Sequence, residues 1–127
     1  MQEVEFSDLK GKILASITAD KYDEEMIFET VNGERYKLFH KQDCCETVVI
    51  EDIIGDLSDL IGSPILLAEE IVYAQDFNPA EVVVPEYQDS FTWTFYKLAT
   101  IKGYVTVRWH GDSNGYYSES VDFEKVS

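Results

Sequence analysis

The stretch that decides the fold is Phe-Thr-Trp-Thr-Phe-Tyr at residues 91–96, together with residues 104–110 that follow it. Aromatic residues alternate with threonine in the first segment, and apolar residues alternate with polar ones in the second. Successive side chains of a β-strand point to opposite faces, so a period of two predicts strands with one buried face. The sequence therefore predicts antiparallel strands whose core face carries Phe91, Trp93, Phe95, Val105, Val107 and Trp109.

The rest of the chain adds strands to this pattern. Residues 12–19 alternate, and residues 25–31 and 35–40 flank Asn32-Gly33, a dipeptide typical of two-residue hairpins. Further strands are predicted at 47–50, 65–75 and 116–123. A short helix is expected in the segment 52–62, where residues 53, 54, 57, 60 and 61 are apolar at helical spacing. The prediction is one α+β domain over residues 1–127, mainly an antiparallel, curled β-sheet with one short helix in the middle of the chain.

The chain is strongly acidic. Its 127 residues carry 25 Asp and Glu against 10 Lys and Arg, a formal charge of −15 at pH 7. Direct binding to nucleic acid or to an anionic membrane is disfavoured, because both need Lys and Arg to meet phosphates. No segment approaches the ~18 continuous apolar residues of a membrane span. The N-terminus carries acids where a targeting peptide would carry bases, so we expect a cytoplasmic protein.

The negative charge is concentrated in the middle of the chain. Residues 42–96 contain twelve acids and no base, whereas residues 97–127 contain four of each. This surplus exceeds the roughly 2–8 charges that keep a small domain soluble, and it predicts a negative surface that meets a positive partner. The alternative is an acidic cytoplasmic protein whose charge serves no partner. The candidate partner-binding residues are Asp43, Glu46, Glu51, Asp52, Asp56, Asp59, Glu69 and Glu70.

A second candidate site is expected on the opposite faces of the C-terminal strands. Polar aromatic and basic side chains there are of the kind that stack on a base or sugar ring and attract an anion. The residues of this candidate ligand pocket are Lys97, Tyr104, Arg108, His110 and Tyr116, with Tyr96 beside them.

His40, Cys44 and Cys45 are weak candidates for a metal site. Zinc needs four converging ligands, and neighbouring cysteines of a strand point to opposite faces. We expect no metal and no cofactor, with His40 at the surface, one cysteine buried and the other half-exposed, and both as thiols in a reducing compartment; a strained disulfide between the two neighbours is the alternative. Nearby acids should also blunt a cysteine nucleophile. No phosphate-binding glycine loop or hydrolase motif is present in the sequence, so we expect no enzymatic activity.

Two blocks of sequence carry a family resemblance. The first is HKQDCCETVVIEDIIGDL at residues 40–57, continuing to LIGSPIL at 60–66. The second is SFTWTFYKLAT at 90–100, followed by GYVTVRW at 103–109, NGYYS at 114–118 and VDF at 121–123. Together they resemble a family of short acidic proteins of unknown function that are encoded in phages, prophages and some bacterial genomes. The resemblance implies a phage-type accessory protein of the bacterial host cytoplasm and supplies no catalytic or binding residue.

Charge and resemblance together predict a non-enzymatic inhibitor of a host defence or nucleic-acid-binding protein. Its partner would be a basic host protein, such as a CRISPR effector or another defence nuclease, so the chain would serve an anti-defence or anti-CRISPR role through its acidic surface. The alternative is an oligomeric binding protein that sequesters a nucleotide-type immune signal in the polar-aromatic pocket. The sequence leaves the oligomeric state open, a homodimer included.

Overall fold

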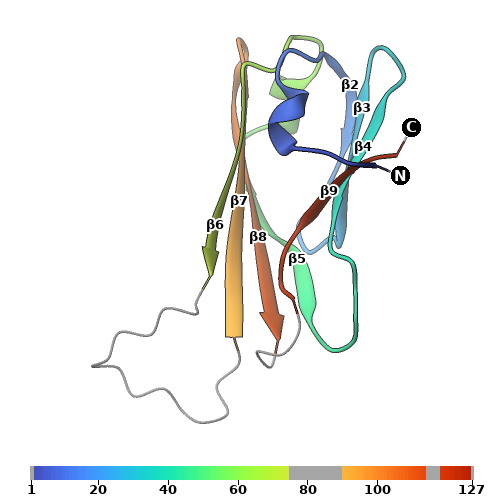
Figure 1. Cartoon of the computed structure of the whole chain (residues 1–127). Coiled ribbons are helices and arrows are strands. Elements are labelled where there is room, and N and C mark those ends of the chain that lie inside the picture. Colours follow the sequence, from blue (N-terminus) through green and yellow to red (C-terminus); the bar gives the residue numbers. More distant parts are fainter. Residues whose placement is uncertain (1, 75–89, 114–117, 127) are drawn as a thin grey trace.

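The computed structural model describes residues 2–74, 90–113 and 118–126, which form almost entirely antiparallel β-structure. Two sheets pack face to face, as Figure 1 shows. One has five strands in the order β1-β9-β4-β3-β2, and the other has four in the order β5-β8-β7-β6. The predicted α+β class is therefore wrong, because the only helical elements among the described residues are two single turns of 3-10 helix.

The strand bounds follow the predicted segments closely in the N-terminal half. The five-stranded sheet comprises β1 (Gln2–Glu3), β2 (Leu14–Thr18), β3 (Glu25–Thr30), β4 (Arg35–Phe39) and β9 (Asp122–Lys125). The four-stranded sheet comprises β5 (Thr47–Ile54), β6 (Leu67–Ala74), β7 (Ser90–Thr100) and β8 (Gly103–Ser113). The last predicted strand, at 116–123, is wrong for most of its length: residues 116 and 117 lie outside the described residues, 118–121 are not in a strand, and β9 begins at Asp122 in the other sheet from β7 and β8.

The predicted hairpin between β3 and β4 is present, with a turn longer than two residues. The Gly33 N–H donates to the Thr30 carbonyl, and the Thr30 N–H donates to the Glu34 carbonyl. Gly33 has a φ of 86°, a left-handed conformation that glycine adopts without strain. This is a turn closed by a left-handed glycine, the usual arrangement of hairpin loops one residue longer than the shortest.

The helix predicted in the segment 52–62 does not form. Strand β5 extends through Ile54, and only the single turn η2 (Leu57–Leu60) follows. Ile54 is 51% exposed, whereas Leu60 is fully buried. The apolar residues therefore belong to a strand and a turn in succession, and their helical spacing does not reflect one buried helical face.

The core lies between the two sheets, and on β7 it takes the face opposite to the predicted one. Tyr96 and Leu98 are fully buried on this strand, and β8 adds its three predicted residues, Val105, Val107 and Trp109. The prediction that Phe91, Trp93 and Phe95 belong to the core is wrong, because these residues lie on the outer face of the sheet with Lys97. Because successive side chains of a strand point to opposite faces, the burial of Tyr96 and Leu98 places Phe91, Trp93 and Phe95 on the outer face.

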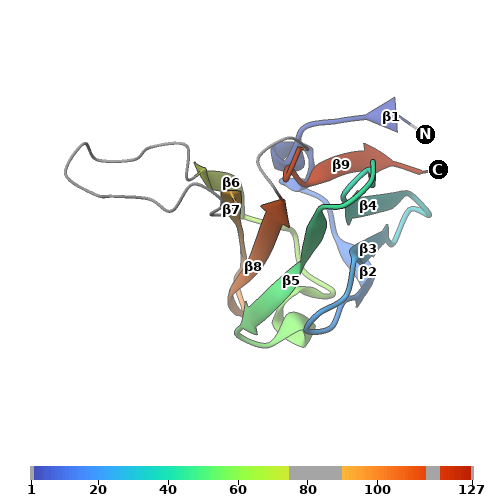
Figure 2. The ribbon, with the colours of Figure 1, turned by 90° about the horizontal axis from the view of Figure 1, so that it is seen from below.

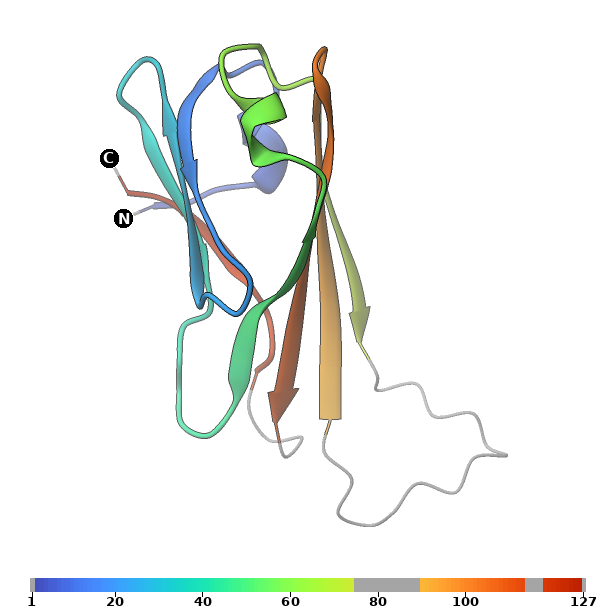
Figure 3. The same ribbon diagram turned by 180° about the vertical axis from the view of Figure 1, so that it is seen from behind.

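An aromatic cluster joins the two sheets near the 3-10 turn η1 (Phe6–Leu9). The Phe6 ring centroid lies 4.6 Å from that of Tyr96 on β7, 5.3 Å from that of Phe123 on β9 and 6.2 Å from that of Phe28 on β3. Figure 3 shows η1 and η2 between the sheets at the same end of the molecule. Phe6 thus contacts strands of both sheets at once.

The two long sides of the sandwich differ. On the β5 side, backbone hydrogen bonds link the layers: the Tyr22 N–H donates to the Ile50 carbonyl and the Ile50 N–H donates to the Asp23 carbonyl. On the opposite side, β6 is the last strand of its sheet, and η1 lies between it and β9 (Figure 2). Main-chain bonds are also present there: the Val4 N–H donates to the Phe123 carbonyl and the Gly11 N–H to the Ile65 carbonyl, so the layers on this side are linked through the segment that contains η1.

No helix among the described residues is long and apolar enough to cross a membrane. Residues 75–89 and 114–117, the latter including Tyr116, lie outside the described residues.

Replacing Phe6 by alanine should lower the free energy of unfolding by about 3–5 kcal/mol, because it leaves a cavity between the two sheets. Urea denaturation followed by circular dichroism measures this loss. Tyr104, an aromatic residue that is 50% exposed on β8, is the matched control. Tyr104→Ala should change the unfolding free energy by about 0.5 kcal/mol or less. Equal losses in the two variants would contradict the role given to Phe6.

Candidate functional site

The structure places the eight predicted partner-binding acids in four separate regions. Asp43 and Glu46 lie in the loop before β5, and Glu51 and Asp52 lie within β5. Asp56 and Asp59 belong to the turn around η2, and Glu69 and Glu70 to β6. The acidic run is therefore not brought together as one surface by the described part of the chain.

Glu46 is buried and serves the loop that contains it. Its side chain has no accessible surface, and its carboxylate accepts hydrogen bonds from the backbone N–H groups of Asp43 and Cys44. His40 Nε2 lies 3.2 Å from the same carboxylate. Burial alone would raise the pKa of Glu46, but these hydrogen bonds outweigh it and hold the pKa below its usual value. Glu46 is thus a structural carboxylate that no partner can reach in this conformation.

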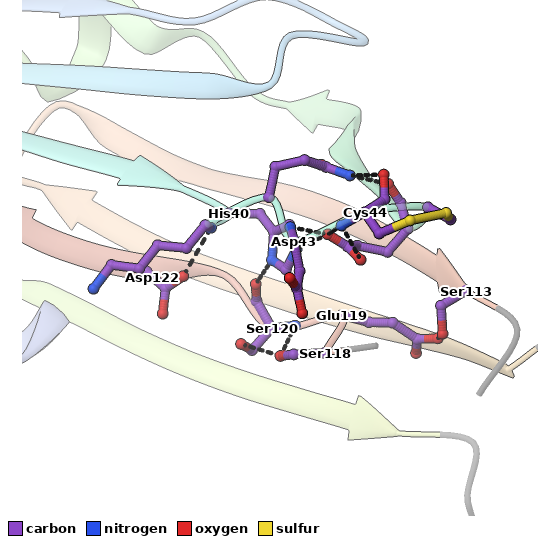
Figure 4. Close-up of polar contacts among 12 residues, drawn as sticks. His40, Asp43, Cys44, Ser113, Ser118, Glu119, Ser120 and Asp122 are labelled. Carbon is purple, nitrogen blue, oxygen red and sulfur yellow. Dashed lines mark hydrogen bonds and ion pairs between the residues drawn. A yellow bond between two sulfur atoms is a disulfide. The ribbon is translucent and has the colours of Figure 1, made fainter. Parts of the chain in front are cut away.

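His40 is part of the same network, as Figure 4 shows. Its side chain is 4% exposed, and Nδ1 lies 2.7 Å from the Ser120 carbonyl oxygen. The prediction of a surface histidine is therefore wrong. Glu119, the residue before Ser120, has a second buried carboxylate. It accepts hydrogen bonds from Ser113 Oγ at 2.6 Å and from Thr92 Oγ1 at 2.7 Å. No sequence signal distinguishes Glu119, since its burial arises only from tertiary structure.

Cys44 and Cys45 are both exposed, and their sulfur atoms are bonded to each other at 2.11 Å. The predictions of two thiols and of one buried cysteine are therefore wrong for this structure. Neither sulfur is a thiolate, so neither is available as a metal ligand or nucleophile in this state. Across the described ranges 2–74, 90–113 and 118–126, no group of three or more His, Cys, Asp or Glu side chains is arranged to hold a metal ion.

Several other acids of the run have internal partners. Glu51 and Asp52 both pair with Arg108 on β8, with Asp52 Oδ2 at 3.7 Å from a guanidinium nitrogen. The hydrogen bond to Glu51 raises the pKa of Arg108, against the opposing effect of burial. Asp56 Oδ1 accepts from both the N–H and the hydroxyl of Ser58, and these bonds lower the Asp56 pKa. These carboxylates stabilise local structure.

Glu69 and Glu70 instead line a cleft on the side of the sandwich where β6 is the outermost strand. The cleft has a volume of 980 Å³ and lies between β6, the N-terminal segment and the residues around the start of β9. Tyr96 donates its hydroxyl proton to Glu70 Oε2 at 2.7 Å, and burial raises the tyrosine pKa. Among the described residues, the lining of this acidic cleft contains six acidic residues and no basic one: Glu3, Glu5, Asp8, Glu69, Glu70 and Asp122.

Four of these six acids were not among the sequence candidates. Glu3, Glu5 and Asp8 come from the N-terminal segment and Asp122 from β9, far from the acidic run. Only the pairing of β1 with β9, and the position of η1 against β6, brings them together. Because that convergence is tertiary, no local pattern could have identified it.

The second candidate set is partly brought together. Lys97, Tyr104, Arg108 and His110 all lie on the outer face of the four-stranded sheet; on β8 this is the predicted face, whereas on β7 it is the face that was predicted for the core. Tyr116 falls outside the described residues, and Tyr96 is buried in the core. Phe91, Trp93 and Phe95, which were predicted to lie in the core, share the outer face with Arg108. Tyr73, Trp93 and Phe95 line a cavity of 440 Å³ together with Arg108.

Glu46→Gln should destabilise the protein at about pH 7 and have a diminishing effect at lower pH. A carboxylate whose pKa is lowered in the folded state stabilises that state above the unfolded-state pKa of about 4.5, and this contribution is lost as the pH falls through the folded-state pKa. Urea unfolding at about pH 7 and about pH 3 measures the difference. Asp43→Asn, which removes an exposed acid of the same loop, is the control and should be close to wild type throughout. A destabilisation by Glu46→Gln that grows on acidification would contradict this account.

Comparison with curated proteins gave no significant match, and comparison with solved structures gave none either. Residues 7–123 match a family described as a domain of unknown function, DUF7448. This match covers both blocks of the sequence resemblance and almost all of the described strands. The chain therefore belongs to the DUF7448 family.

Proposed function

We propose that this chain is a non-enzymatic binding protein whose acidic cleft receives a Lys- and Arg-rich segment of a partner protein. The observation that carries the proposal is a cleft of 980 Å³ whose lining, in the described part of the chain, has six acidic residues and no base. Among the described residues, the carboxylates of Glu5, Asp8 and Glu69 make no ion pair or hydrogen bond. They are therefore available to a positively charged partner, unlike Glu46, Glu51 and Asp56.

Strand β6 gives the cleft a second means of recognition. Of the described strands it pairs with β7 alone, and its residues 68–71 line the cleft. In an antiparallel edge strand, alternate N–H and C=O groups point away from the sheet. An extended segment can add to such an edge through main-chain hydrogen bonds, while its basic side chains reach the carboxylates. This favours an extended basic segment over a globular patch of positive charge.

The proposal extends to a phage-type inhibitor in the bacterial host cytoplasm. Basic segments that are extended and exposed in their free form are typical of proteins that grip nucleic-acid phosphates. Occupying such a segment would compete with nucleic acid, which is the role expected of an inhibitor of a CRISPR effector or another defence nuclease. The charge of −15 would also speed association with a basic partner at low salt.

A labelled peptide of alternating Arg and Val residues should bind the protein, and fluorescence anisotropy measures the affinity. The triple variant Glu5→Gln, Asp8→Asn, Glu69→Gln should weaken binding by about tenfold or more, because it removes three carboxylates of the cleft. Raising the salt from about 50 mM to about 300 mM should also weaken binding.

The matched control removes three exposed acids that lie away from the cleft: Asp23→Asn, Glu24→Gln, Asp43→Asn. It has the same net charge as the cleft variant and should bind the peptide nearly as well as wild type. Equal losses in the two triple variants would show that only net charge matters and would overturn the cleft. Binding of a matched Glu-Val peptide would overturn the charge argument.

The inhibitor role is tested with the same three proteins as baits in host lysate. We expect the wild type and the control variant to retain a nucleic-acid-binding protein that the cleft variant does not retain. The wild type should also inhibit the DNA binding or DNA cleavage of that protein. Failure to retain any such protein, or retention by all three baits alike, would contradict this role without bearing on the peptide result.

The nucleotide-sequestration alternative has weaker support. It requires a cation on the outer face that can bind a phosphate, and Arg108 is the basic residue of the cavity there. Arg108 is already paired with Glu51 and Asp52, so an incoming phosphate would meet two carboxylates beside it.

A further inference from the structure

The outer face of the four-stranded sheet carries an aromatic platform formed by Tyr73, Trp93, Phe95 and Arg108. These four residues line a shallow cavity of 440 Å³, within the usual size range of small-ligand sites. The platform lies on the other face of the sheet from the core, and Tyr73 is 61% exposed. Large aromatic side chains on a solvent-facing sheet surface are the exception in a soluble domain, and their clustering marks a candidate binding surface.

Strand register explains how these side chains meet. Tyr73 on β6 is opposite Trp93 on β7, which is opposite His110 on β8. In the next row on the same face, Phe95 is opposite Arg108. The rings pack against one another: Tyr73 and Phe95 meet edge to face at 5.6 Å between centroids, and Trp93 lies 4.5 Å from His110. The platform is therefore built by three paired strands, and its rings already pack against one another.

Three charged side chains, those of Arg108, Glu51 and Asp52, form a polar group at the border of the platform. The Arg108 guanidinium lies 5.4 Å from the Trp93 ring centroid and is hydrogen-bonded to Glu51, with Asp52 also within ion-pair distance. The guanidinium has five N–H donors, and the two carboxylates have several lone pairs beyond those used in the pairing. The group therefore offers both donors and acceptors at fixed positions, and it has no positive charge left over.

The combination indicates what kind of ligand fits. A ligand must present an apolar face to the rings and hydroxyl groups to the Arg108–Glu51–Asp52 group, without a net charge of its own. The ring of a sugar has this character, since its C–H groups form an apolar face and its hydroxyls both donate and accept. We propose that the aromatic platform is a binding site for a neutral saccharide.

Other occupants are less compatible with the charges. An anionic ligand would meet two carboxylates and a protein of net charge −15. A second copy of the chain would bring the same large negative charge. A Lys or Arg side chain would compete with Arg108, which already occupies the cation position over Trp93. A neutral saccharide is not repelled by the two carboxylates or by the net charge of the chain, and it does not compete with Arg108 for the position over Trp93.

Intrinsic tryptophan fluorescence tests the proposal directly. The chain has two tryptophans, Trp93 on the platform and Trp109, which is fully buried on the other face of the sheet. Titration with cellohexaose, maltohexaose, xylohexaose and hexa-N-acetylchitohexaose, all neutral, should give a saturable emission change with at least one of them. The change should be insensitive to salt, unlike binding in the acidic cleft, because no charge is neutralised.

Two variants connect the signal with the platform. Phe95→Ala and, separately, Tyr73→Ala remove a ring but keep the Trp93 reporter, and each should weaken saccharide binding by about tenfold, as expected for loss of one stacking surface. Tyr73 is largely exposed, so its variant should fold even if Phe95→Ala does not. Tyr104→Ala, on the same sheet face but outside the cavity, is the matched control and should bind as wild type.

The proposal is overturned if none of the four oligosaccharides changes the emission, or if the Tyr73→Ala variant binds them as tightly as wild type. It is also overturned if AMP or the Arg-Val peptide produces the platform signal and the saccharides do not. The cleft variant Glu5→Gln, Asp8→Asn, Glu69→Gln should keep saccharide binding intact, so failure of this proposal and failure of the acidic cleft are separate results.

Discussion

The structure depends on the contact of one aromatic ring with both sheets. Phe6 packs against Tyr96 of one layer and against Phe28 and Phe123 of the other. On the opposite long side, main-chain hydrogen bonds from the loop around Tyr22 hold the layers together. On the β6 side, the segment around η1 links the layers through the Phe6 ring and through main-chain hydrogen bonds at Val4 and Gly11, and the same arrangement leaves room beside β6 for the acidic cleft. The position of η1 between β6 and β9 therefore determines both the packing of Phe6 and the presence of the cleft.

Much of the fold was predictable because it is local. The β3–β4 hairpin follows from two alternating segments around Asn32-Gly33, and the buried face of β8 follows from Val105, Val107 and Trp109. The orientation of β7 was mispredicted from a window that ended at Tyr96. Both faces of that window carry aromatic residues, so alternation alone could not choose between them. The next two residues resolve the choice: Lys97 lies on the face of Phe95, and Leu98 lies on the face of Tyr96. A window extended to Leu98 therefore indicates that the Tyr96 face is the buried one.

The candidate sites were less predictable, for a physical reason. A run of acids in sequence is divided by the strand pleat and by turns, so its members face different surroundings. Glu46 became buried among backbone N–H groups, and Glu51 became bound to Arg108. The cleft, by contrast, draws carboxylates from both ends of the chain through strand pairing. Composition could indicate that negative charge matters, but only tertiary structure indicates which carboxylates are left for a partner.

The strand order of the five-stranded sheet has a consequence for how the chain reaches this state. β9 is last in the sequence, yet it lies between β1 and β4 and pairs with both. Until β9 is synthesised, the β3–β4 hairpin exposes an unpaired edge on β4, and the N-terminal strand has no neighbour to pair with. Pairings between segments so distant in sequence close slowly, since the loop entropy must be lost before any contact forms. The emerging chain must therefore pass through a stage with an open sheet edge, when it is most exposed to association with other nascent chains or to capture by chaperones.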